Sequence, residues 1–423
     1  MKYKKTVIKN GMRIITVPQK DAQAVTVLIM VSTGSNYEDK NIGGISHFLE
    51  HLCFKGTEKR PTATGVSTEL DSLGAVSNAF TSNEYTGYYA KSNPKHMYKI
   101  LEIVSDIYLN SIFPEAEIEK EKGVIIDEIN MYEDNPPRKV HDVYNELLYG
   151  DQPSGRSILG TKENIKQMMR DDIVAYREKH YVPEATTIVV SGKFKESDVI
   201  KEIKKIFEGR EPKNKIKSKK TIVNQSVPQI KVHFKETDQT HIVLGVRSYS
   251  YFDKRRVVGD VMATILGSGM SSRLFKKLRD EMGVGYYVKA QADESYDYGS
   301  FYARTGVDNS RALEVVKAIV EEMEKLNTEL VPDAELNKAK EYSVGSMRLS
   351  LETSDSLGEF YGDQEILLGK IKTPNELEEE IRKVTAKDIK KLAKQIFINE
   401  GLNLAMIGPI SDIKEYKKAL RFK

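Results

Sequence analysis

The feature that most restricts the fold of this chain is an internal repeat, in which the second half matches the first at one constant offset. Its clearest matches are Val27 with Val243, Asp172 with Asp388, Tyr181 with Phe397 and Gly192 with Gly408. Repeats of this kind mark structural units that fold alike. We therefore predict an α+β protein made of two homologous α/β-sandwich domains of roughly 200 residues each.

The repeat predicts three segments: a first domain over residues 1–210, a linker over 211–228 and a second domain over 229–423. Residues 213–220 are charged and polar without periodicity, which is typical of a linker. The lysines in this segment could indicate a nucleic-acid patch. No aromatic residue interleaves them and the overall charge is balanced, so we interpret them as a solvated linker.

Composition describes an ordinary globular protein, with 39% hydrophobic and 30% charged residues and a net charge of +3. This balance gives no bulk attraction to nucleic acid or to an anionic membrane, so we expect neither as a partner. The single cysteine, Cys53, excludes an intramolecular disulfide and fits a reducing compartment; we expect it to be a small packed hydrophobe. The first residues contain no secretory signal, and no segment approaches the about 18 apolar residues of a membrane span. We expect a cytoplasmic location.

Periodicity and turn residues predict several elements of the first domain. The Asn10-Gly11 pair favours a hairpin over residues 5–17. The other expected elements are a central strand at 25–31, strands at 74–82 and 85–90, a helix at 96–110, and a helix that Pro114 opens and Pro136-Pro137 closes.

Residues 43–56 form a predicted helix with two distinct faces. Its apolar stripe consists of Ile45, Phe48, Leu49 and Leu52. His47 and His51 project from another face one turn apart, where two imidazoles reach one metal ion. Glu50 lies beside them, and a carboxylate in so apolar a helix is costly to bury without a partner. The order His-x-x-Glu-His is the inverse of a common zinc-peptidase motif; a catalytic zinc needs one further protein ligand and an open position for water.

These residues resemble the pitrilysin–insulysin family of zinc peptidases (the inverzincins), specifically its short, processing-peptidase-like branch. In that family the third ligand is a glutamate at a characteristic distance beyond the second histidine, and Glu128 lies at this distance from His51. Glu121, seven residues earlier, matches an acidic residue that supports the site. The resemblance implies one Zn²⁺ per chain, held by His47, His51 and Glu128, with Glu50 as general base.

The repeat supports this interpretation independently. The offset that relates Asp172 to Asp388 places the trio His47, Glu50 and His51 on Ala263, Leu266 and Gly267. The second unit therefore keeps the scaffold without the ligands. If the trio served only for packing, both copies would have equal reason to keep it.

The second half matches the family at an arginine and a tyrosine seven residues apart. Arg279 and Tyr286 have this spacing, and the resemblance implies that they donate hydrogen bonds to the substrate carbonyl or oxyanion. Without the resemblance, Arg279 would be a surface charge and Tyr286 a half-buried strand residue. Family members of this length form clamshell-type dimers. Because this chain holds both sets of residues, we expect a homodimer.

The resemblance also assigns an edge strand that pairs with the substrate backbone. It comprises Asn78, Ala79, Phe80 and Thr81. The segment 267–274 lacks the ending of a phosphate loop, and we expect Ser271 or Ser272 to cap the next helix. This loop is short beside the glycine-rich loop that captures presequences in organellar relatives, so short or unfolded peptides are the expected substrates.

We therefore predict a zinc-dependent endopeptidase that acts in an enclosed dimer chamber. Two alternatives remain open: a non-catalytic or partner-dependent peptide-binding subunit of a heterodimer, and a zinc-stabilised scaffold, which would need a fourth protein ligand. Manganese or cobalt is not excluded by the ligand types. We expect structural or surface roles for the other histidines, which are His96, His141, His180, His233 and His241.

Overall fold

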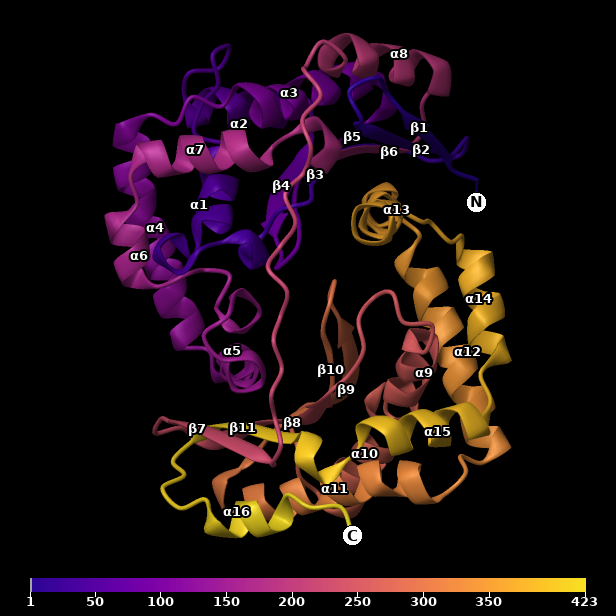
Figure 1. The fold of residues 1–423 in the computed structure, drawn as a ribbon. Coiled ribbons are helices and arrows are strands. Elements are labelled where there is room, and N and C mark those ends of the chain that lie inside the picture. The colour runs from indigo at the N-terminus through magenta and orange to yellow at the C-terminus, as the bar shows by residue number, and fades with distance from the viewer. Residues whose placement is uncertain (1) are drawn as a thin grey trace. The chain divides into compact units, whose positions relative to one another are not determined.

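The computed structural model describes residues 2–423 and divides them into two compact units (Figure 1). Unit 1 comprises residues up to 130 together with 157–219 and 348–373, and unit 2 comprises 131–156, 220–347 and 374–423. Each unit is built around one mixed β-sheet with helices packed on it. The predicted pair of α/β domains is confirmed.

The sheet of unit 1 has the strand order β1-β2-β6-β3-β5-β4. Its strands are β1 (Lys4–Val7), β2 (Arg13–Pro18), β3 (Val25–Val31), β4 (Val76–Thr81), β5 (Thr86–Ser92) and β6 (Thr186–Gly192). The predicted hairpin is the antiparallel pair β1/β2. β3 lies between β6 and β5 and all seven of its residues are buried, as its continuous apolar sequence predicts.

Helices cover both faces of this sheet. They are α1 (Ile45–Leu52), α2 (Ala63–Ser72), α3 (Met97–Asn110), α4 (Glu115–Glu133), α6 (Lys162–Gln167), α7 (Arg170–His180), α8 (Glu196–Phe207) and α13 (Ser354–Leu368). α3 and α13 pack on opposite faces (Figure 1). The close approach of α13 depends on glycine, since a Cβ at Gly362 would lie 2.5 Å from the sulfur of Met30.

The sheet of unit 2 has the strand order β7-β11-β8-β10-β9. Its strands are β7 (Gln229–Phe234), β8 (Gln239–Arg247), β9 (Val288–Glu294), β10 (Gly299–Asp308) and β11 (Leu402–Gly408). α5 packs on one face, where Val140 and Tyr144 meet Val243 and Ala405. The helices of this unit are α5 (Pro136–Tyr149), α9 (Arg256–Gly267), α10 (Arg273–Phe275), α11 (Ala312–Thr328), α12 (Asp333–Ser350), α14 (Pro374–Lys383), α15 (Ala386–Ile396) and α16 (Lys414–Ala419).

The repeat is visible in the strand pairing, with one correction. The parallel pair of Arg13 with Thr187 in unit 1 recurs in unit 2 as Gln229 with Asn403, at the common offset of the repeat. The central strands differ. Val27 faces Val190, whereas Met406, the counterpart of Val190, faces Ile242.

Val27 therefore corresponds to Ile242, and its predicted match with Val243 is wrong by one residue. A slip of one residue places a side chain on the opposite face of a sheet. The correction thus changes which face of β8 corresponds to which face of β3.

Each unit includes one helix from the other half of the sequence. α5 follows α4 in the chain but packs on the sheet of unit 2, and α13 follows α12 but packs on the sheet of unit 1. The expected linker coincides with the connection between α8 and β7, which contains no helix or strand; the expected boundaries do not include this exchange. α4 ends at Glu133, and Pro136 begins α5 rather than closing α4.

Two further expectations concern burial and hydropathy. Cys53 is fully buried, and burial raises the pKa of its thiol, as expected for a packed hydrophobe. Among residues 2–423, no helix combines the length and the hydropathy needed to span a bilayer.

Candidate metal centre

The short helix α1 carries the motif and is fixed at both its start and its apolar face. Gly44 precedes it with a left-handed φ of 95°, and its amide donates to the Glu38 carboxylate at 2.7 Å. The amide of Ser46 donates to the other Glu38 oxygen at 2.8 Å, so one carboxylate binds two free amides of the first turn. The whole apolar stripe is buried, as predicted, at Ile45, Phe48, Leu49 and Leu52.

Three side chains converge beside this helix. The Nε2 atoms of His47 and His51 lie 3.3 Å apart, and each lies 3.5 Å from Oε2 of Glu128 on α4. Ligands bound tetrahedrally at the usual zinc distances of about 2.0–2.1 Å stand about 3.3–3.4 Å from one another. The three measured separations therefore match one face of such a tetrahedron.

The donor set also fits a zinc ion chemically. Two imidazole nitrogens and one carboxylate oxygen are the ligands found in catalytic zinc sites that keep an open position for water. In residues 2–423 this is the one group of three or more such side chains close enough to share an ion. The two facing Nε2 atoms cannot both carry protons at 3.3 Å without repulsion, and a cation between them removes this conflict.

Glu121 holds one of the two histidines in place. Nδ1 of His51 donates to Oε1 of Glu121 at 2.8 Å, which leaves the Nε2 lone pair directed at the triad. Lys55 donates to the other oxygen of Glu121 at 2.6 Å. Burial tends to raise the pKa of Glu121, but the hydrogen bonds from His51 and Lys55 outweigh it and the pKa is lowered.

Lys55 was not among the residues predicted from the sequence, although it lies one helical turn beyond His51. The two histidines also differ in their second nitrogen. Nδ1 of His47 is buried without a hydrogen-bond partner among the described residues.

Glu50 lies next to the triad in a setting that favours proton uptake. Burial raises the pKa of its carboxyl group, while a hydrogen bond from Thr81 and the charge of His51 act in the opposite direction. Oγ1 of Thr81 donates to Oε2 of Glu50 at 2.5 Å. From the sequence, Thr81 was predicted only as part of the substrate-binding strand. The alternation of side chains along β4 could have indicated its contact with Glu50, because it places Thr81 on the same face of the strand as Ala79.

The predicted edge strand is β4, and the structure places it at the end of the sheet, paired on one side only with β5. Asn78 is exposed, Ala79 is 8% exposed, and Phe80 covers Gly87 of the neighbouring strand. An edge strand beside α1 offers free backbone groups to an extended peptide.

Arg279 and Tyr286 belong to unit 2 and lie close together within it. Nη1 of Arg279 donates to the carbonyl of Gly285 at 2.9 Å, next to Tyr286. The Tyr286 side chain is 73% exposed, so it is not the half-buried strand residue of the alternative interpretation. Ser272 occupies the position before the next helix, but its hydroxyl donates to Gly269 instead of to that helix. The substrate-binding role of the pair stays a prediction.

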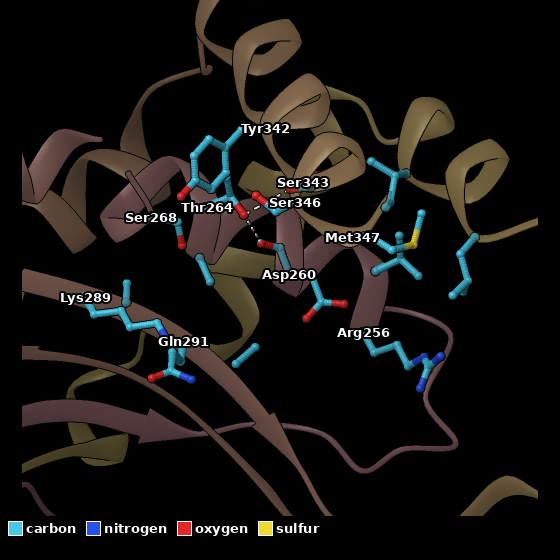
Figure 2. Close-up of a pocket in the computed structure, with 16 residues that line it drawn as sticks. Arg256, Asp260, Thr264, Ser268, Lys289, Gln291, Tyr342, Ser343, Ser346 and Met347 are labelled. Atoms are coloured by element: carbon cyan, nitrogen blue, oxygen red, sulfur yellow. Dashed lines mark hydrogen bonds between the residues drawn. The ribbon is translucent and has the colours of Figure 1, made fainter. Parts of the chain in front are cut away.

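Unit 2 contains a cavity of about 440 Å³ that is lined by α9, α12 and β9 (Figure 2). These elements correspond to α1, α4 and β4, which surround the triad in unit 1. In the lining of this cavity, the hydroxyl of Thr264 donates to the backbone carbonyl of Asp260 and forms a hydrogen bond with the hydroxyl of Ser343 on α12. None of the lining residues is a histidine or a cysteine. A Cβ at Gly267 would lie 2.3 Å from the amide nitrogen of Ala290, so a second histidine does not fit here.

Comparison with known sequences places the whole chain in one family. Residues 13–162 match the profile described as insulinase (peptidase family M16), and residues 167–342 match the profile described as the M16 inactive domain. The uncharacterized zinc protease YmxG of Bacillus subtilis is 35% identical over 96% of this chain and 98% of its own length. A zinc protease of Rickettsia bellii is 33% identical over 95% of this chain and 96% of its own.

Solved structures share the fold at lower sequence identity. A protease from Helicobacter pylori superposes with a TM-score of 0.88 at 22% identity, over 96% of this chain and 99% of that one. A chain of the complex III dimer from Candida albicans superposes with a TM-score of 0.84 at 17% identity, over 99% of both chains. The length of these matches and the identity to the bacterial proteases establish that the chain belongs to the insulinase family of peptidases, M16.

Proposed function

We propose that this protein is a zinc-dependent endopeptidase of short or unfolded peptides. The observation that carries the proposal is the set of three separations among His47, His51 and Glu128, which fits one tetrahedral zinc ion per chain. The names of the bacterial relatives support zinc as the metal. No fourth protein ligand joins the triad among residues 2–423, which counts against a purely structural zinc site.

When bound, a zinc ion supplies a Lewis acid that activates water and polarises a peptide carbonyl. Glu50 acts as the general base: its carboxylate takes a proton from the attacking water and delivers it to the leaving amine. Thr81 orients that carboxylate, and Glu121 fixes the ring of His51. A pKa raised by burial suits Glu50 for this exchange, because a general base works best when its pKa approaches the working pH.

Substrate binding is assigned to two places. The β4 residues Asn78, Ala79, Phe80 and Thr81 pair with an extended peptide through their backbone, which gives affinity without strict sequence preference. Arg279 and Tyr286 donate hydrogen bonds to the oxyanion, an effect worth about 3–4 kcal/mol per well-placed donor. We propose that two identical chains form an enclosed chamber, and that the protein works in the cytoplasm, where a single unpaired cysteine is common.

A second candidate is a non-catalytic or partner-dependent peptide-binding subunit. Its support is the shared fold with a chain of complex III. The complete triad and the adjacent Glu50 favour the peptidase, because unit 2 shows that this scaffold also folds without them.

The test is hydrolysis of a quenched, extended peptide by the purified protein loaded with zinc. We expect cleavage that a chelator stops and zinc restores, and at least a hundredfold loss of kcat in Glu50→Gln with zinc content unchanged. Glu58→Gln is the matched control, because Glu58 is exposed and lies outside the site. Full activity in Glu50→Gln would refute the mechanism; zinc-loaded protein that binds peptides without cutting any would favour the second candidate.

A further inference from the structure

Unit 2 has a sheet face that its covering helix protects only in part. α5 packs over the middle of this face, where Tyr144 lies 5.6 Å from the ring of Tyr302 on β10. The strand beyond β10 is β9, the edge of the sheet. On β9 the residues that point to the α5 side are polar, and Lys289 among them is exposed.

Two cations stand directly opposite each other at the border of the area that α5 covers. Lys289 of β9 pairs in register with Arg304 of β10. Side chains at such positions have Cβ atoms about 4.5–5.5 Å apart, and like charges placed there repel each other. The repulsion between two such cations destabilises the sheet unless an anion lies between them.

Arg304 is held in position but keeps unused donors. Its Nη1 donates to Nε2 of His141 on α5 at 3.0 Å, and its Nε is buried without a hydrogen-bond partner. Within residues 2–423 neither Arg304 nor Lys289 forms an ion pair with an acidic side chain. The nearest acidic residue on this face of β9 is Asp293, which accepts a hydrogen bond from Tyr302 at 2.7 Å.

The ionisable neighbours of the two cations are His141 and Asp293. Burial, with a smaller contribution from the charges of Arg304 and Lys289, lowers the pKa of His141 to about 4. His141 is therefore neutral near pH 7, and its Nε2 accepts a hydrogen bond from Nη1 of Arg304, so it positions the guanidinium without competing for an anion. Desolvation raises the pKa of Asp293, while the hydrogen bond from Tyr302 and the charges of Lys289 and Arg304 act in the opposite direction.

We propose that Lys289 and Arg304 form a subsite for a carboxylate group of a bound peptide, either an acidic side chain or the C-terminal carboxylate. The peptide origin of the carboxylate rests on the proposed function. A carboxylate between the two side chains accepts charge-assisted hydrogen bonds from both and removes their repulsion. Because β9 is the edge strand, a ligand reaches Lys289 without displacing another strand.

The test measures peptide binding instead of cleavage, in the full-length protein carrying Glu50→Gln. Three fluorescent extended peptides of equal length are compared by anisotropy at low salt: a neutral peptide with an amidated C-terminus, the same peptide with one internal glutamate, and the neutral peptide with a free carboxylate. We expect one of the two anionic peptides to bind roughly tenfold more tightly than the neutral one. The internal glutamate and the free terminus distinguish the two sources.

When Lys289→Glu is introduced into the Glu50→Gln protein, the preference for an anionic peptide should disappear, whereas Lys289→Arg should retain it. Lys387→Glu, an exposed lysine on α15 of the same unit, is the matched control and should leave the preference unchanged. Equal binding of all three peptides, no binding of any, or an unchanged preference in Lys289→Glu would overturn the subsite. If the wild-type protein cleaves no peptide while the preference for a carboxylate persists, only the proposed function fails.

Discussion

Glu121 is the side chain whose replacement tests most closely how the proposed metal ligands are held. It accepts hydrogen bonds from Nδ1 of His51 at 2.8 Å and from Lys55 at 2.6 Å, and it lies two helical turns before Glu128 on α4. It does not belong to the triad itself. Glu121→Gln keeps an oxygen that accepts from His51 but removes the charge, and Glu121→Ala removes both.

The size of the effect follows from these contacts. A hydrogen bond to an ionised partner contributes about 1.5–3 kcal/mol, against about 0.5–1.5 kcal/mol for a neutral one, so Glu121→Gln should cost about 1–1.5 kcal/mol of zinc-binding free energy. That is roughly a tenfold weaker Kd for zinc. Glu121→Ala also frees the ring of His51 and should approach the about hundredfold loss typical when such supporting partners are removed.

Zinc affinity is measured by competition with a chromogenic chelator at pH 7, with Glu115→Gln on the same helix as the control. Glu115 is exposed at the start of α4 and should behave as wild type. We expect zinc affinity to fall in the order wild type, Glu121→Gln, Glu121→Ala. Unchanged affinity in Glu121→Ala would show that the contact with His51 does not position the metal ligands.

Three more predictions follow from single side chains. Thr81→Val should raise the pKa of Glu50 and move the acidic limb of the pH profile of kcat/KM to higher pH, while Thr81→Ser leaves the profile unchanged. Burial raises the pKa of Asp363 to about 7, so the free energy of unfolding of the wild-type protein falls as pH rises from about 4 to 7 and the buried carboxyl group ionises. In urea unfolding, Asp363→Asn should be more stable than wild type by about 2–4 kcal/mol at pH 8 and equally stable below pH 4. The pKa of Glu102 is lowered to about 2: burial opposes this shift, but hydrogen bonds from Arg60 and Lys59 exceed it. The ionised Glu102 therefore stabilises the folded protein above about pH 4.5, and this stabilisation is lost toward pH 2. Because the side chain is partly exposed, Glu102→Gln should lower the free energy of unfolding by about 1 kcal/mol at pH 7 and leave it unchanged near pH 2. A difference in the free energy of unfolding that does not depend on pH would contradict this.

Much of the fold and the metal centre could be predicted from local patterns. The apolar stripe of α1 and the spacing of His47 and His51 determine which helix face is buried and which carries ligands. The position of Glu128 depended on the family resemblance, since no local pattern links residues that far apart. In the structure the side chains of these three residues lie close together, and their role as metal ligands stays a prediction.

Other features depend on tertiary contacts that periodicity does not encode. An amphipathic helix indicates that one face is buried but not against which sheet, so the exchange of α5 and α13 could not be foreseen. The register of β8 was misjudged because β3 and β8 are buried on both faces, and such strands lack the alternation that would fix their alignment. The contact of Lys55 with Glu121 likewise requires α1 and α4 to be placed first.

X-ray absorption spectroscopy at the zinc K-edge, combined with metal analysis of the purified chain, tests the central claim most directly. The structure predicts one zinc per chain surrounded by nitrogen and oxygen neighbours at about 2.0–2.2 Å, two of them imidazoles, and loss of this signal in His51→Ala. Protein without stoichiometric zinc after loading, or a sulfur neighbour at about 2.3 Å that implicates Cys53, would contradict the metal centre described for His47, His51 and Glu128.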